Sequence, residues 1–125
     1  MVDRLKQVIL IRRDLNMRRG KEIAQGAHAS GDCLFGQLRQ ADDVEIDHRI
    51  IQWVRSGMAK VCLQVADEAE LMQCFNQARE QGLLASLITD SGRTEFAGVA
   101  TRTACAIGPD HSAAIDNITG KLKLY

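Results

Sequence analysis

The chain has 125 residues, of which 46% are hydrophobic and 26% charged, and its sixteen basic and sixteen acidic residues cancel. This length fits a single core, so residues 1–125 are predicted to form one domain. Zero net charge argues against a protein that holds DNA or other polyanions by bulk charge alone.

No long apolar segment is found near the start of the chain. The run from Val8 to Ile11 is much shorter than a signal-peptide core or a membrane span, and Arg12 follows it. We therefore expect a cytoplasmic protein with no membrane partner. The cysteines and histidines lack the spacing of a zinc site, and no metal or other cofactor is expected. All four cysteines are predicted to be buried apolar residues: Cys33, Cys62, Cys74 and Cys105.

The first two elements are a strand and a helix. The continuous apolar run predicts a central strand over 6–12, because a strand with one solvated face would alternate with polar residues. A helix is predicted over 20–40, with its small first half, including Gly26, in close contact with a sheet or a substrate. Its apolar stripe consists of Ile23, Ala27, Gly31, Leu34 and Leu38.

Shorter elements follow along the rest of the chain. The patterns predict a helix over 46–54, a strand over 60–65, a helix over 67–81, a strand over 83–89, a loop over 90–98, a strand over 100–107, a helix over 113–118 and an extended tail over 121–125. Gly108 and Pro109 are predicted to stop the last strand. This order predicts an α/β fold, a single three-layer domain whose four-stranded mixed sheet carries helices on both faces.

Positive charge is concentrated at the start of the chain. Seven basic and two acidic residues lie between positions 1 and 21, which gives this segment a net charge of +5 and the remainder −5. The charge falls at the carboxyl end of the first strand and the start of the first helix, where unpaired backbone amides also attract anions. A phosphate-bearing partner is one interpretation, and a solvated turn is the other. The basic residues are Arg4, Lys6, Arg12, Arg13, Arg18, Arg19 and Lys21.

Gly20 and Lys21 at the helix start match half of a phosphate-binding P-loop. The first glycine and the magnesium-binding hydroxyl of that motif are missing, which excludes a nucleotide triphosphatase of this type. Lys21, Gln25 and His28 follow at i, i+4 and i+7, so they share one helical stripe. That stripe is either part of a site or ordinary polar surface.

A second candidate segment, Asp90–Thr94, follows the strand over 83–89. It offers a carboxylate, two hydroxyls and a flexible turn at the end of a strand, where open α/β sheets bind ligands. If the first and third strands run parallel, Asp90 and Lys21 lie at the same edge of the sheet. A plain Asp-Gly turn is the alternative. Thr101 and Thr103 are two positions apart and are expected on one face of the last strand.

Taken together, these segments resemble the type 2 peptidyl-tRNA hydrolases, a family typical of archaea and eukaryotes. Five stretches in the family's order carry the resemblance: 8–15, 17–29, 90–94, 101–109 and 118–124. The resemblance implies hydrolysis of the ester between a peptide, or an N-blocked amino acid, and the terminal ribose of tRNA, without a required metal. It also implies a mixed four-stranded sheet, often in a homodimer, that binds the acceptor end of peptidyl-tRNA.

The resemblance also implies a set of site residues. The catalytic candidates are Lys21, Asp90, Thr94, Thr101 and Thr103. The candidates for substrate binding are Arg18, Arg19, Gly20, Gln25, His28 and Arg93. Ester hydrolysis needs an oriented water, a stabilised oxyanion and a proton for the departing oxygen. Lys21 suits the oxyanion or a phosphate, and Asp90 suits a base or an orienting group. With no Ser-His-Asp pattern, we hypothesise direct attack by water.

Two features depart from the family pattern. Ser91 and Glu95 stand where the family commonly has Ala and Gln, and Glu95 adds negative charge near an RNA ligand. The loop over 97–100 is about one residue longer than usual, which leaves open whether Thr101 or Thr103 is the acting threonine.

Two other functions remain open at this point. One is a non-catalytic tRNA-binding or adaptor domain with the same fold. The other is an interaction protein that docks through the helix carrying Trp53, although the burial tendency of tryptophan favours a core position for this residue.

Overall fold

The computed structural model describes residues 4–93 and 95–125, and its strands and helices follow the predicted order. The strands are β1 (Leu5–Arg12), β2 (Lys60–Val65), β3 (Ala85–Asp90) and β4 (Thr101–His111). The helices are α1 (Arg19–Phe35), the 3-10 helix η1 (Gly36–Arg39), α2 (His48–Arg55), α3 (Glu68–Glu80) and α4 (Ser112–Thr119). The predicted α/β class and the four-stranded mixed sheet are confirmed. Within the described residues, no helix is both long enough and apolar enough to cross a bilayer.

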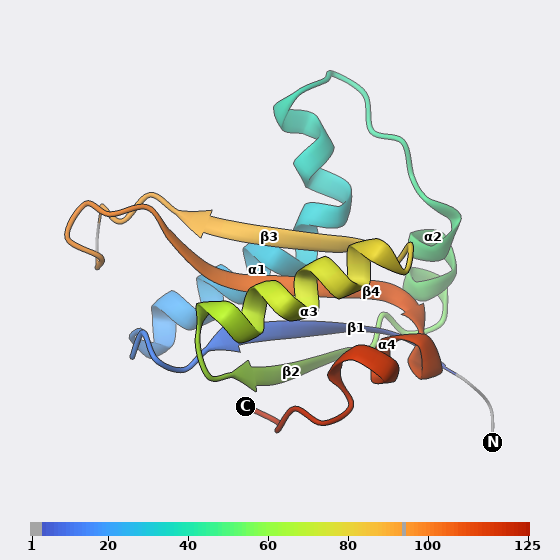
Figure 1. Ribbon diagram of the computed structural model, residues 1–125. Coiled ribbons are helices and arrows are strands. Elements are labelled where there is room, and N and C mark those ends of the chain that lie inside the picture. The colour runs from blue at the N-terminus through green and yellow to red at the C-terminus, as the bar shows by residue number, and fades with distance from the viewer. Residues whose placement is uncertain (1–3, 94) are drawn as a thin grey trace.

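The sheet has the strand order β2-β1-β4-β3. β1 and β2 are parallel, whereas β4 is antiparallel to both of its neighbours, β1 and β3. β1 and β3 therefore point the same way, which brings Lys21 and Asp90 to the same edge of the sheet. The carboxyl ends of β1, β2 and β3 meet at the left edge of the sheet in Figure 1.

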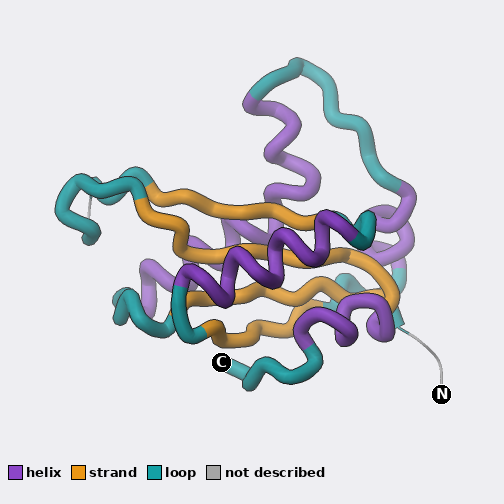
Figure 2. Tube along the Cα trace, in the orientation of Figure 1, coloured by secondary structure: helices purple, strands orange, loops and turns teal. Residues whose placement is uncertain are grey.

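Helices cover both faces of the sheet. α3 and α4 lie in front of it and α1 crosses behind it (Figures 1 and 2). Val8 and Leu10 of β1 pack toward α3, whereas Ile9 and Ile11 belong to a second cluster with Ala29 of α1. β1 is thus central, as predicted, and its apolar run is continuous because both of its faces are buried.

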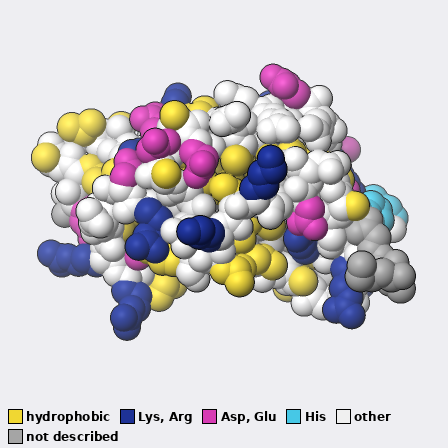
Figure 3. Space-filling model, turned by 60° about the horizontal axis from the view of Figure 1, so that its bottom comes forward, with side chains coloured by type: hydrophobic (Ala, Val, Ile, Leu, Met, Phe, Trp, Pro, Cys, Tyr) yellow, Lys and Arg dark blue, Asp and Glu magenta, His cyan; other side chains and the backbone are white. Residues whose placement is uncertain are grey.

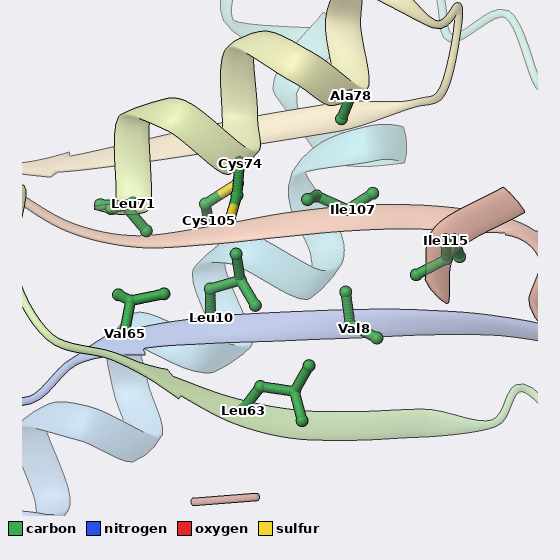
Figure 4. Packing of buried hydrophobic residues seen from close by; sticks show 10 residues of the cluster. All are labelled: Val8, Leu10, Leu63, Val65, Leu71, Cys74, Ala78, Cys105, Ile107 and Ile115. Atoms are coloured by element: carbon green, nitrogen blue, oxygen red, sulfur yellow. The ribbon is translucent and has the colours of Figure 1, made fainter. Parts of the chain in front are cut away.

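The core in front of the sheet is formed mainly by apolar side chains of α3 and the central strands. Figure 4 shows Leu71, Cys74 and Ala78 of α3 above Leu10 and Cys105. Cys74 and Cys105 are buried, as predicted. The prediction is wrong for Cys62, which is exposed on the edge strand β2, and Cys33 is only partly buried.

α1 turns a different face to the sheet from the one its apolar stripe predicts. Its buried residues are Gln25, Gly26, Ala29 and Ser30. Ile23, by contrast, is 67% exposed and Leu38 is 49% exposed. The buried polar groups have partners: the Ser30 hydroxyl donates to Gln7 Oε1 at 2.6 Å, and Gln7 Nε2 donates to the Ser30 carbonyl at 3.1 Å. Because these hydrogen bonds offset the cost of burying polar groups, α1 can bury a partly polar face. The face predicted from hydrophobic periodicity is therefore wrong.

Two predicted boundaries are also wrong. The α-helical part of α1 ends at Phe35 and tightens into η1 at Gly36, because glycine is a weak helix former. β4 continues to His111 instead of stopping at Gly108 and Pro109. One extra residue between its pairs with Lys6 and Val8 forms a bulge, where a proline without an N–H is tolerated.

Trp53 and the tail complete the packing. Trp53 is 3% exposed and its indole N–H donates to the Ala59 carbonyl at 2.8 Å, so the core position is confirmed and Trp53 presents no docking surface. The end of the chain runs along the free edge of β2. Gln64 N–H donates to the Lys123 carbonyl at 2.9 Å, and Tyr125 N–H donates to the Cys62 carbonyl at 3.0 Å.

The close approach of α1 to the sheet gives a test of the fold. A Cβ built on Gly26 would lie 3.6 Å from Ile9 Cγ2, which is an ordinary contact. We expect Gly26→Ala to raise the free energy of unfolding by about 0.5–1 kcal/mol through helix propensity. Gly26→Leu should lower it by about 1–3 kcal/mol through overpacking.

Urea denaturation measures both changes. Gly20→Ala is the matched control, because a Cβ at that position meets no atom within 4 Å. A loss of stability in Gly26→Ala that Gly20→Ala does not show would mean that α1 lies closer to β1 than described.

Candidate active site

The first turn of α1 and the end of β3 bring an ammonium and a carboxylate into direct contact. Lys21 Nζ lies 2.8 Å from Asp90 Oδ1, although the two residues are 69 positions apart. Their side chains are only 16% and 13% exposed. Such a shielded pair interacts more strongly than a surface ion pair, which solvent screens.

Asp90 also holds its own loop. Its Oδ2 accepts the backbone N–H of Gly92 at 2.8 Å, so the Asp-Gly turn considered as the alternative is present together with the ion pair. Gly92 has a φ of +83°, and a Cβ there would lie 2.2 Å from the Val99 carbonyl oxygen. Only glycine fits this turn, which aims the carboxylate back toward α1.

These contacts lower the pKa of Asp90. The hydrogen bond from Lys21 is the main cause, and the Gly92 N–H and the charges of Lys21 and His28 act in the same direction against the effect of burial. Asp90 is therefore a carboxylate at neutral pH. Both of its oxygens accept hydrogen bonds, which suits an orienting group better than a base.

Gln25 connects this pair to the sheet. Its Nε2 lies 3.5 Å from Asp90 Oδ1, and its Oε1 accepts a bond from the Thr103 hydroxyl at 2.5 Å. Gln25 is 4% exposed and Thr103 is fully buried. Because Thr103 occupies the amide oxygen, the amide nitrogen of Gln25 is the end that faces Asp90.

The predicted stripe of Lys21, Gln25 and His28 thus divides by depth. Lys21 is partly buried, Gln25 lies between the helix and the sheet, and His28 is exposed. The stripe runs along the line where α1 packs against β3 and β4. Neither of the two interpretations, part of a site or ordinary polar surface, therefore describes all three residues.

The two threonines of β4 differ in accessibility. Thr101 is paired with Asp90 in the sheet, is partly exposed, and donates its hydroxyl to the Val99 carbonyl at 2.8 Å. Thr103 lies two residues deeper. Arg102 between them extends toward α3, where it pairs with Glu68 at 3.2 Å, as strand alternation requires. Thr94, the other threonine candidate, lies outside the described residues.

The remaining candidates lie around the pair. Arg18, Arg19 and Arg93 are exposed, and a Cβ at Gly20 would meet open space. Arg18 Nε lies 3.9 Å from Glu95 Oε1, so the extra negative charge of Glu95 faces a cation. Among the described residues, His, Cys, Asp and Glu side chains form no group of three that a metal ion would need.

Sequence reasoning missed two aromatic residues near the helix start. Lys21 Nζ lies 5.9 Å from the centre of the Phe96 ring. The Tyr125 hydroxyl donates to Glu22, which raises the pKa of Tyr125, and the guanidinium of Arg13 lies 5.0 Å from its ring centre. Tyr125 is 103 positions from Glu22, and no local pattern signals the contact.

The chain is similar to known proteins over nearly its whole length. A family model described as "Peptidyl-tRNA hydrolase PTH2" matches residues 5–125. Proteins named peptidyl-tRNA hydrolase from Aeropyrum pernix and Methanocaldococcus jannaschii are 43% and 41% identical over 120 residues, which is 96% of this chain and 95% and 99% of theirs. One from Halobacterium salinarum is 40% identical over 97% of this chain and 100% of its own.

A solved structure adds support for the fold alone. It is a protein of unknown function from Agrobacterium tumefaciens, with a TM-score of 0.60 at 16% identity, and the match covers 100% of this chain and 99% of that one.

Proposed function

This chain belongs to the peptidyl-tRNA hydrolase PTH2 family, and from that premise we propose that it hydrolyses the ester of peptidyl-tRNA at the Lys21–Asp90 pair. The observation that carries this assignment is the 2.8 Å contact between the two largely buried charged groups at the carboxyl edge of the sheet. Loops at this edge are where α/β sheets bind ligands. The substrates are peptidyl-tRNA and N-blocked aminoacyl-tRNA of the cytoplasm.

The reaction in this proposal is direct attack by water. Water adds to the ester carbonyl carbon, negative charge develops on the carbonyl oxygen, and the bond to the ribose oxygen then breaks with transfer of a proton to that oxygen. The products are the peptide acid and free tRNA. The ammonium of Lys21 faces the developing oxyanion, since a fixed positive charge in a shielded site stabilises such an intermediate strongly.

Asp90 orients Lys21 in this arrangement. Its lowered pKa keeps it charged, and both of its oxygens are engaged by Lys21, Gln25 and Gly92. In this proposal Thr101, which is partly exposed at the rim, holds the attacking water. Thr103 is fully buried and acts through Gln25, so it is a positioning residue rather than one that touches the substrate.

The exposed residues around the pair bind the acceptor end of the tRNA. Arg18, Arg19 and Arg93 supply positive charge, and Gly20 leaves room beside the helix start. His28, exposed two turns further along α1, supplies a polar contact. A non-catalytic tRNA-binding domain would have no need of the shielded ion pair. Salt-dependent tRNA binding without any turnover would nevertheless favour that alternative.

Rates of ester release test the pair. Lys21→Ala and Asp90→Ala should each slow the release of peptide from N-acetyl-aminoacyl-tRNA by at least about ten- to a hundredfold, without added metal and with a chelator present. The chain offers a control, because Lys6 and Asp116 form an ion pair of similar length, 2.7 Å, elsewhere, although Asp116 is 53% exposed. Lys6→Ala with Asp116→Ala should leave the rate unchanged. Unchanged rates in both site variants would remove the site.

We further propose that the protein acts as a homodimer. A groove of about 670 Å³ runs between α1, α2 and β2, and its apolar lining includes Ile23, Leu34, Phe35 and Met58. Ile23 and Phe35 are 67% and 63% exposed. Figure 3 shows apolar side chains gathered in the lower centre of the face that includes the β2 edge. A contiguous exposed apolar area of this kind marks an interface.

Light scattering across a concentration series tests the dimer. The wild type should have the mass of two chains, and Ile23→Glu with Phe35→Glu should have the mass of one, because two buried carboxylates would oppose the contact. Val54→Glu is the control, since Val54 is 48% exposed on α2 and does not line the groove. A wild type with the mass of one chain at every concentration would contradict the dimer.

A further inference from the structure

A polar cleft of about 590 Å³ lies at the same edge of the sheet as the Lys21–Asp90 pair, which the proposed function makes the reactive pair. It is bounded by the β1–α1 loop, the end of β2, the first turn of α3 and the tail of the chain. Its basic lining residues are Arg13, Lys121 and Lys123, all of them exposed. The two lysines flank Leu122, which packs against the core and so anchors this part of the tail.

The acidic residues of this cleft are already engaged within the protein. Asp14 accepts bonds from both Nε and an Nη of Arg12, at 3.0 and 2.7 Å, which lowers its pKa. Glu70 accepts the backbone N–H of Ala66 at 2.9 Å. No carboxylate of residues 4–93 and 95–125 forms an ion pair with the three basic side chains. Because Arg12 balances Asp14, the three basic side chains face only the charge of Glu70, and the cleft presents an excess of positive charge to solvent.

The tail lysines complete a basic surface that the start of the chain provides only in part. Lys6, Arg12 and Lys21 are each paired with an aspartate. Of the other four, Arg18 lies near Glu95 and Arg4 precedes β1 at the opposite end of the sheet. Arg13 and Arg19 remain at this edge, and Lys121 and Lys123 join them from the other end of the sequence. In Figure 3, Lys and Arg side chains lie to the left of the apolar area and just above it.

Tyr125 links this cleft to the start of α1. Its ring lies under the guanidinium of Arg13 at 5.0 Å, and its hydroxyl donates to Glu22, the neighbour of Lys21. An RNA strand whose last ribose lies at Lys21 would therefore pass the first turn of α1 before it reaches the cleft.

We propose that the cleft binds backbone phosphates of the tRNA nucleotides that precede the ester-bearing ribose. This proposal rests on the proposed function, since it assumes that the ester lies at the Lys21–Asp90 pair. Phosphates suit the cleft because ammonium and guanidinium groups that form no ion pair with a carboxylate exchange counterions for them, without any need for base recognition.

Two esters with the same acyl group separate the cleft from the reactive pair. N-acetyl-aminoacyl-tRNA carries the phosphates, and the same acyl ester of adenosine carries none. For Lys121→Ala with Lys123→Ala, the KM for the tRNA ester should rise about tenfold with kcat nearly unchanged. The ratio of kcat/KM between the tRNA and adenosine esters should fall by the same factor.

Salt dependence gives a second readout. A contact with a single-strand phosphate contributes about 0.7 to the slope of log affinity against log salt concentration. The double variant should therefore lose about 1.4 from the slope of log kcat/KM. Lys121→Arg with Lys123→Arg should restore both quantities, and Arg39→Ala with Arg55→Ala, which removes two exposed charges outside the cleft, should leave them unchanged.

The outcomes distinguish the two proposals. The proposal for the cleft would be overturned by a double alanine variant with wild-type KM and slope, or by one whose kcat/KM falls equally on both esters. Either result would leave the proposal for the Lys21–Asp90 pair intact. If the wild type hydrolyses neither ester, the proposed function fails. The dissociation constant of uncharged tRNA then tests the cleft separately. If the cleft binds phosphates, the double alanine variant should bind this tRNA about tenfold more weakly than the wild type.

Discussion

The ion pair between Lys21 and Asp90 fixes the start of α1 against the end of β3, and much of the structure follows from it. Shielding two charges from water is costly unless hydrogen bonds satisfy them. Here the Gly92 N–H and the Gln25 amide supply those bonds, and Thr103 holds the amide in place. The pair is therefore part of one connected network that spans a helix, a loop and two strands.

This network requires α1 to turn a partly polar face toward the sheet. Gln25 and Ser30 bond across that interface, and Gly26 and Ala29 allow the close approach that such short bonds need. The apolar stripe of the helix is consequently left on the outside, where Ile23 lines the groove that we propose binds a second subunit. The same orientation of the helix thus accounts for both the Lys21–Asp90 pair and the exposed apolar surface.

Much of this arrangement is predictable from the sequence, for identifiable physical reasons. The run from Val8 to Ile11 predicts a strand covered on both faces, and parallel first and third strands predict that Lys21 and Asp90 share an edge. The buried face of α1 is not predictable in this way. It depends on the hydrogen bond between Gln25 and Thr103, which are 78 positions apart. The hydrophobic periodicity of one helix cannot predict a contact with so distant a residue. The tail lysines are missed for the same reason.

The central claim is that Thr103, through Gln25, holds the reactive pair in working geometry. Single-turnover release of peptide from N-acetyl-aminoacyl-tRNA tests it most directly in Thr103→Val and Thr103→Ser, with folding checked by urea denaturation. The valine variant loses the hydroxyl that orients Gln25, so its rate should fall about tenfold, the equivalent of one hydrogen bond. The serine variant should stay within about twofold of the wild type. A folded valine variant that releases peptide at the wild-type rate would contradict the claim.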